Sequence, residues 1–243
     1  MAAIFKREMR NYFTSPIGYI VVFVYFAVYG FLFSYLFSIG NPDISIFSSS
    51  SIFTMVLMPI LTMRLFSEER RQKTDQALFT APVSIFSIVM GKFFAAICVF
   101  AISQSITLVF QLIFAFNVTV DWVNYFSYLI GTLLMASSLI SIGMFISALT
   151  DSQIVSAIGS LAISFLLVAL DFILLVAKTF IASISNININ SYILDILGWI
   201  SFTGRYQTYF EGIFDIANTV FFISFTAIFI FLTVRVQESK RWA

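Results

Sequence analysis

Long apolar runs separated by short polar segments dominate the pattern of this chain. A membrane-spanning helix needs about 20 predominantly apolar residues, within a range of about 17 to 25. Six runs meet this requirement, and they cover residues 17–39, 49–65, 93–116, 125–149, 153–177 and 216–236. The pattern therefore predicts an all-α integral membrane protein with six transmembrane helices.

Two amphipathic segments lie outside these runs. Residues 3–14 place cations on one side of a predicted helix and apolar side chains on the other, which is typical of a helix lying in the lipid headgroup layer. Residues 192–211 are rich in aromatic side chains and predict short helices at the outer interface. Within the second segment, Trp199, Tyr206 and Phe210 either form an aromatic belt or act as an outer gate.

Charged residues gather between the second and third runs, from Arg64 to Lys92. Ser67 is a candidate helix cap, and Glu68 and Glu69 lie in the first turn, where the helix dipole favours negative charge. Pro82 follows the predicted last turn. Two interpretations remain open from these charges alone. The segment is either a basic cluster that fixes membrane topology or a helix that docks on a soluble partner.

The composition excludes a soluble protein. Hydrophobic residues make up 60% of the chain and charged residues only 10%, which is too little charge to cover a soluble globule. No long polar region separates the apolar runs. We therefore expect a single transmembrane domain over residues 1–243.

The basic residues predict the orientation of this domain. If both ends are cytoplasmic, 11 of the 13 Lys and Arg residues lie inside, and only Lys178 and Arg205 lie outside. Such a bias matches the tendency of cytoplasmic loops to carry an excess of Lys and Arg. The charged segment between the second and third spans is then cytoplasmic, and Arg64 and Lys92 are expected to anchor its flanking spans at the interface.

Polar side chains inside the spans are few. Ser156, Ser160 and Ser164 recur every four residues and form either a close-packing ridge or a polar lining for a substrate path. Gln104 and Gln111 share a helix face and either line a cavity between protomers or bond to a neighbouring helix. Asp171 lies near the outer end of the fifth span, where it is either functional or reaches out to the interface.

Three sequence motifs resemble one known family. FSEERRQKTDQALFTAPVSIFSIVMGKF resembles the cytoplasmic coupling region of ABC-2 type transporter permeases. REMRNYFTSPIGYI and FTGRYQTYFEGIFDIANTVFF resemble the permeases associated with gliding motility. Two departures stand out, since Lys73 occupies a position where many members carry Gly, and the segment around Tyr206 lacks the His often found there.

The resemblance implies a permease subunit in the bacterial cytoplasmic (inner) membrane. Such a subunit forms a dimer, with itself or with a related permease, and is driven by a separate ATP-binding subunit. It implies a cytoplasmic coupling helix whose partner-contacting residues are Glu68, Glu69, Arg70, Arg71, Thr74, Asp75, Leu78 and Pro82. Export is expected rather than import, and an outer-facing accessory protein is a further candidate partner. We expect no nucleic-acid partner.

The sequence independently places ATP hydrolysis elsewhere. It contains no G-x-x-x-x-G-K-[ST] motif, whose backbone N–H groups would hold the phosphates of ATP. It also contains no histidine. We therefore expect no catalytic residue, metal or bound cofactor in this chain, with ATP and Mg²⁺ held by the partner.

Two other classes of function are alternatives. The chain could anchor a motility or cell-envelope machine without moving any solute, as its resemblance to gliding-associated permeases allows. An autonomous channel or ion-coupled carrier is less consistent with spans that hold so few ionisable groups.

Overall fold

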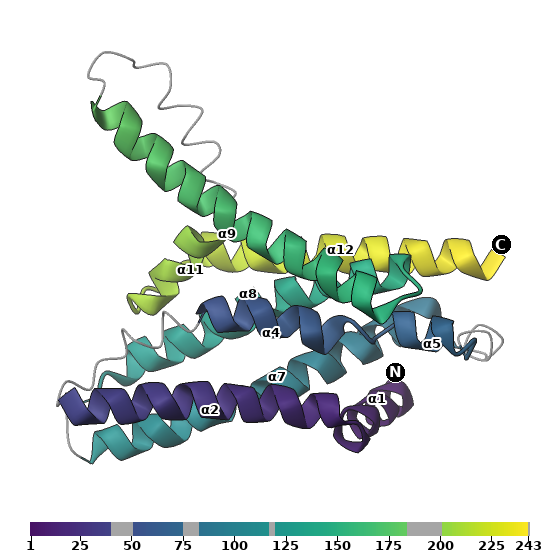
Figure 1. Ribbon diagram of the computed structural model, residues 1–243, viewed down its shortest axis with the longest axis horizontal. Helices are drawn as coiled ribbons and strands as arrows, with labels where there is room; N and C mark the ends of the chain where they lie inside the picture. The colour runs from purple at the N-terminus through teal and green to yellow at the C-terminus, as the bar shows by residue number, and fades with distance from the viewer. Residues whose placement is uncertain (40–50, 75–82, 117–119, 184–200, 243) are drawn as a thin grey trace.

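The computed structural model describes residues 1–39, 51–74, 83–116, 120–183 and 201–242, and regular structure in these ranges is helical throughout (Figure 1). The all-α prediction is therefore confirmed for the described residues. The helices are α1 (Ala2–Thr14), α2 (Pro16–Ile39), α4 (Ser51–Thr62), α5 (Ser67–Arg71), α7 (Ile85–Ala115), α8 (Trp122–Leu149), α9 (Gln153–Ser183), α11 (Phe202–Phe210) and α12 (Ile216–Trp242).

Five of these helices, α2, α7, α8, α9 and α12, are long and apolar enough to cross a membrane. They coincide with five of the six predicted spans. The remaining predicted span, 49–65, corresponds to α4, which has 12 residues and contains Pro59. This length is below that of a membrane-spanning helix.

Three helices extend well beyond the predicted spans. α7 begins at Ile85 rather than at residue 93, because the Ser84 side chain accepts a hydrogen bond from the Ser87 amide and caps the helix. α9 continues past residue 177 to Ser183, and α12 continues past residue 236 to Trp242. Hydropathy marks only the apolar part of a helix, whereas backbone hydrogen bonding continues into polar sequence.

α8 lies at the centre of the bundle. It contacts α4, α7, α9, α11 and α12, and with α7 it is the most buried of the five long helices. Two glycines on α8 permit close approaches: an added Cβ at Gly131 would collide with the Tyr209 side chain, and one at Gly143 would collide with Thr62. The neighbouring helices α11 and α4 are therefore held directly against α8.

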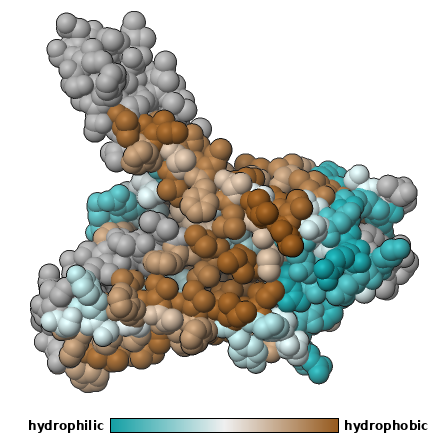
Figure 2. Space-filling model, in the orientation of Figure 1, coloured by the Kyte–Doolittle hydropathy of each residue, from teal (hydrophilic) through white to brown (hydrophobic). Residues whose placement is uncertain are grey.

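One end of the helix bundle is more polar than the rest of the visible surface. α1, α5 and the C-terminal end of α12 lie at the same end of the bundle (Figure 1). Hydrophilic residues gather at that end, and hydrophobic residues cover much of the remaining visible surface (Figure 2). Both chain termini thus lie beside the charged segment, at what we call the charged end.

Candidate functional site

The helix predicted for the charged segment is much shorter than expected. α5 ends at Arg71, so the prediction of a helix reaching Pro82 is wrong. Ser67 does not cap it either, because Phe66 occupies the N-cap position and the Ser67 hydroxyl donates to the Met63 carbonyl. The Ser147 hydroxyl of α8 instead accepts hydrogen bonds from the Phe66 and Ser67 amides, at 3.1 Å each. A neighbouring helix therefore satisfies the first amides of α5.

The C-terminal end of α5 carries an unusual backbone conformation. Lys73 has a φ of +57°, in the left-handed region that glycine adopts most readily. The Lys73 amide bonds the Arg70 carbonyl at 3.0 Å, and the Thr74 amide bonds the Glu69 carbonyl at 2.9 Å. This pair of bonds is the Schellman motif that ends many helices. The geometry explains why a glycine suits position 73 and why the lysine here is strained.

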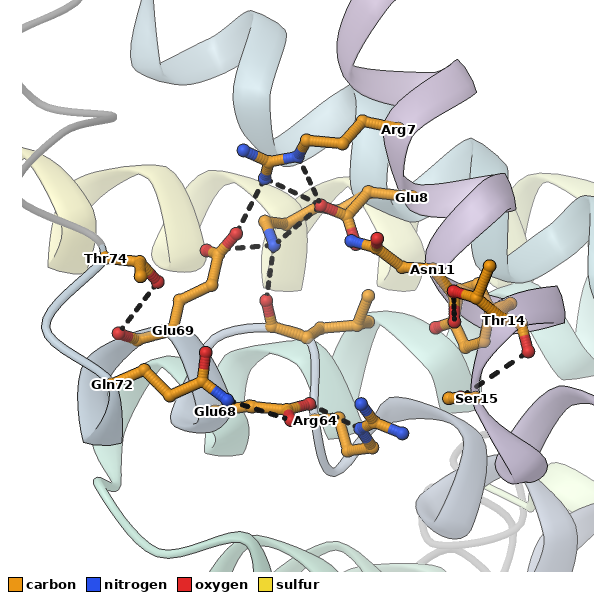
Figure 3. A pocket seen from close by; sticks show the side chains of 13 residues that line it. Arg7, Glu8, Asn11, Thr14, Ser15, Arg64, Glu68, Glu69, Gln72 and Thr74 are labelled. Carbon is orange, nitrogen blue, oxygen red and sulfur yellow. Dashed lines mark hydrogen bonds and ion pairs between the residues drawn. The ribbon is translucent and has the colours of Figure 1, made fainter.

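Four charged side chains form a closed ring at the charged end, which we call the charge ring (Figure 3). The Arg7 guanidinium lies 2.8 Å from the Glu8 carboxylate and 2.6 Å from the Glu69 carboxylate. The Lys92 ammonium lies 3.3 Å from Glu8 and 3.0 Å from Glu69. Two cations and two anions from α1, α5 and α7 therefore neutralise one another.

Lys92 is the buried member of the charge ring. Its side chain is only 1% exposed and therefore contacts other parts of the chain, whereas its predicted role was to anchor a span at the membrane interface. Besides the two carboxylates, its ammonium donates to the Leu65 carbonyl, in the turn between α4 and α5. A buried charge is tolerated only when it is paired and hydrogen-bonded. Lys92 meets this condition by joining three parts of the chain.

The charge ring also alters the acidity of its members in α1. Burial disfavours the charged form of Glu8, but the charges and hydrogen bonds of Lys92 and Arg7 outweigh it and lower the pKa of Glu8. For Arg7, burial is likewise opposed, and the hydrogen bonds and charges of Glu8 and Glu69 raise its pKa. Both residues therefore remain ionised at neutral pH.

Two further ion pairs fix α5 on its other sides. Arg64 binds Glu68 at 2.5 Å, and Arg70 binds Asp151 at 2.7 Å in the turn between α8 and α9. Glu68, Glu69 and Arg70 thus have partners within this chain. Arg71 and Thr74 are exposed, as are the two residues between them. Asp75, Leu78 and Pro82 lie outside the described residues.

A cavity of about 390 Å³ lies beside the charge ring. The close-up shows its charged and polar lining side chains (Figure 3). The lining residues come from α1, from the α4–α5 region and from α7, and they are Arg7, Glu8, Asn11, Tyr12, Thr14, Ser15, Arg64, Leu65, Glu68, Glu69, Gln72, Thr74 and Lys92. All four members of the charge ring thus line the cavity, together with other residues of α1 and of the α4–α5 region.

Gln104 belongs to a buried network of hydroxyl groups. Its amide nitrogen lies 3.4 Å from the Tyr128 hydroxyl. Tyr128 bonds Tyr29 at 2.8 Å, Tyr29 bonds Tyr25 at 3.0 Å, and Tyr25 bonds Thr54 at 3.3 Å. The network connects α7, α8, α2 and α4. These contacts favour the interpretation of Gln104 as a residue that bonds to a neighbouring helix.

Gln111 and the serine ridge are buried as well. The Gln111 side-chain oxygen has no hydrogen-bond partner in the described part of the chain. Ser160 and Ser164 donate back to carbonyls of their own helix, at Ser156 and Ser160. α9 packs against α4 and α8, and an added Cβ at Gly159 would lie 3.1 Å from Ile146. The ridge therefore fits the close-packing interpretation better than a polar lining.

Asp171 of α9 holds α11. Its carboxylate accepts a hydrogen bond of 2.8 Å from the Thr203 amide, in the first turn of that helix. Within α11, the Tyr206 hydroxyl lies 3.1 Å from the Thr132 hydroxyl of α8, and Phe210 is partly buried. Trp199 lies outside the described residues. Asp171 of α9 and Thr132 of α8 thus both bind α11, and neither role considered for Asp171 or Tyr206 included these contacts.

Several residues of these sites escaped sequence reasoning. Glu8, Asp151, Ser147 and Tyr128 each contact a residue far away in the chain. One local signal was available, because Glu8 is the only acidic residue among the cations of residues 3–14. The other three residues have no distinctive local pattern.

Comparison with known proteins identifies the family. None of the curated proteins matches the chain. A family model described as ABC-2 family transporter protein matches residues 2–236, which is nearly the whole chain. The match includes α1, α5 and all but the last residues of α12. The match agrees with the membrane helices and with the coupling-region motif. The chain belongs to the ABC-2 family of transporter proteins.

Proposed function

We propose that this protein is the permease subunit of an ATP-driven exporter that works as a dimer with separate ATP-binding subunits. Membership of the ABC-2 family makes it a membrane permease component of an ABC transporter. The direction of transport, the dimer and the partners belong to the proposal. So do the six-span layout, in which residues 49–65 with α4 at their centre form the second span, the cytoplasmic termini, the inner membrane and the gliding-motility subfamily.

The observation that supports this proposal is that ion pairs attach α5 to several other elements while its C-terminal end stays exposed. Its base is fixed by ion pairs to α1, α7 and the α8–α9 turn, whereas the segment from Arg71 to Thr74 is exposed. A partner that contacts this exposed end pushes on an element joined to several membrane helices. This arrangement would allow α5 to pass a movement of a soluble subunit on to the membrane helices.

The proposed mechanism divides the chemistry between two proteins. The partner binds ATP and Mg²⁺ and performs hydrolysis, and this chain receives the resulting movement at α5. Closure of two ATP-binding subunits displaces the two α5 helices of a permease dimer. The displacement opens a path between the permease chains toward the outside.

The structure changes which residues should be tested. Reversing the charge of Glu68 or Glu69 would break ion pairs within this chain, so loss of function in such variants would not isolate partner contact. Arg71 is exposed and suits the test better. Arg71→Glu should weaken binding of the ATP-binding subunit about tenfold at low salt, because exposed interface charges mainly affect association.

The matched control is Arg241→Glu, which makes the same charge change at an exposed position of α12. Both variants and the unmodified permease are reconstituted in nanodiscs, and affinity for the ATP-binding subunit and stimulation of its ATPase are measured. Equal affinity for all three would contradict docking at α5. ATP-dependent accumulation of substrate in vesicles then separates a transporter from a membrane anchor, which would bind the ATPase without moving solute.

A further inference from the structure

The charge ring links the interfacial helix to the element proposed to receive the ATPase. Lys92 lies 84 residues from Glu8 in the chain, and its ammonium contacts α1, α5 and the turn that connects α4 to α5. Lys92 therefore connects α1 to α5 directly.

Gly91 and Lys92 act together on α1. An added Cβ at Gly91 would lie 2.9 Å from Ile4 Cγ2 and 3.4 Å from the Met1 carbonyl oxygen, so α1 packs directly on α7 at this point. One residue later, Lys92 binds Glu8, which lies one turn further along α1. Close packing and an ion pair therefore fix α1 on α7 at adjacent positions.

A second contact fixes the other half of α1. The Tyr12 hydroxyl donates to the Leu61 carbonyl at 3.1 Å, near the end of α4. Tyr12 is buried. α1 is thus attached to α7 at Ile4 and Glu8, and to α4 at Tyr12. A movement of the α4–α5 region would therefore move α1 as well.

The buried and exposed ion pairs of α5 differ in strength. The Arg70–Asp151 pair links α5 to the α8–α9 turn, but the Asp151 side chain is 72% exposed. Exposed pairs are weak because water and salt screen them. Breaking a buried pair strands a charge away from water, which is far more costly. The charge ring, with Lys92 at its buried side, is therefore the stronger connection.

We propose that Lys92 is the positioning residue that makes α1, α5 and the start of α7 move as one unit. This inference rests on the proposed function, since it describes how movement received at the exposed end of α5 is passed on. The interfacial helix α1 is then part of the moving element rather than a fixed membrane anchor. Lys92 acts through Glu8, Glu69 and the Leu65 carbonyl.

The first experiment tests the connection in the permease alone, without any partner. Hydrogen exchange of the amides of residues 2–14 and 67–71 is compared in the unmodified chain, Lys92→Met, Lys92→Arg and Asp151→Asn. Lys92→Met should raise exchange in both segments by about tenfold or more, because a buried ion pair loses one partner. Lys92→Arg should restore protection, and Asp151→Asn should leave residues 2–14 unchanged.

The second experiment uses the complex with its ATP-binding subunit in nanodiscs. Lys92→Met should bind that subunit with unchanged affinity but lose the ATP-dependent change in exchange of residues 2–14 and most of the ATPase stimulation. Lys92→Arg should recover both. Arg7→Gln opens the same charge ring at its most exposed member and serves as a second variant with less effect on folding.

The outcomes are distinct. Unchanged exchange of residues 2–14 in both Lys92→Met and Arg7→Gln overturns the inference, whatever the ATPase does. Reduced affinity for the ATP-binding subunit in Lys92→Met also overturns it, because Lys92 would then act in docking. Failure of the unmodified permease to bind the subunit contradicts the proposed function but leaves the first experiment to decide the connection.

Discussion

Gly143 of α8 lies directly against Thr62 of α4. A Cβ added at position 143 would lie 2.9 Å from the Thr62 Cβ and overlap the Thr62 hydroxyl oxygen. Thr62 is fully buried and donates its hydroxyl to the Met58 carbonyl at 2.9 Å. This approach positions the end of α4, and with it the turn into α5, against the most central helix of the bundle.

Substituting Gly143 should therefore destabilise the fold. Gly143→Ala forces α4 away from α8, and overpacking of this kind costs about 1–3 kcal/mol. The thermal midpoint of the detergent-solubilised protein should fall accordingly. Gly30→Ala is the control, because its added Cβ meets only Phe110, at 3.9 Å. Equal midpoints for the two variants would show that the α4–α8 contact is looser than the structure indicates.

Replacing Lys73 should have the opposite effect. Lys73→Gly removes the penalty of a side chain in the left-handed region, which is about 1–2 kcal/mol. Protection of the residue 72–74 amides from hydrogen exchange should increase. Lys73→Ala separates conformation from charge, since it removes the charge but keeps the Cβ. A gain in Lys73→Ala as large as that in Lys73→Gly would contradict the conformational explanation.

Glu8 should make stability depend on pH. Its pKa is lowered from the ordinary value of 4.5 in the folded protein, so its ionised form stabilises the fold. This contribution is fully present above pH 4.5 and is lost as the pH falls through the lower folded-state pKa. The thermal midpoint of the unmodified protein should therefore fall as the pH drops below about 4.5.

Glu8→Gln provides the comparison for this prediction. The variant cannot ionise at position 8, so its midpoint at pH 7 should be lower than that of the unmodified protein. The difference between the two proteins should shrink as the pH is lowered, since protonated Glu8 resembles glutamine. A constant difference from pH 7 to pH 3.5 would exclude Glu8 as its source.

Asp171 should stabilise α11. Asp171→Leu removes the acceptor for the Thr203 amide, and loss of such a cap costs about 0.5–2 kcal/mol. Hydrogen exchange of residues 202–210 should become faster. Asp171→Asn retains a carbonyl oxygen and should preserve most of the protection. If both variants exchange like the unmodified chain, the Asp171–Thr203 bond does not hold α11.

The membrane helices were predictable from sequence because hydropathy is a local property. α2, α7, α8, α9 and α12 each contain a run of apolar residues long enough to span a bilayer, and no distant contact is needed to recognise it. The amphipathic segment 3–14 was predictable for the same reason, and it forms α1. Helix ends were less predictable, since capping at Ser84 begins α7 in polar sequence.

The candidate site was predictable only in part. The charged segment and its position between two apolar runs follow from the sequence, but the partners of its side chains do not. Glu68 and Glu69 are predicted from the sequence to contact a partner subunit, whereas in the structure both form ion pairs within the chain. Helical periodicity describes neighbours three or four residues apart, and it holds no information about residues on other helices.

The sequence by itself determined that this is an all-α membrane protein of the ABC-2 type with one charged segment between its apolar runs. Only the tertiary structure decided that Lys92 is buried, that Glu8 and Arg7 complete a ring with it, and that Arg71 is left exposed. The reason is physical. The fate of a charge depends on which opposite charges the folded helices bring within about 4 Å, and that distance is set by helix packing rather than by the residues beside it.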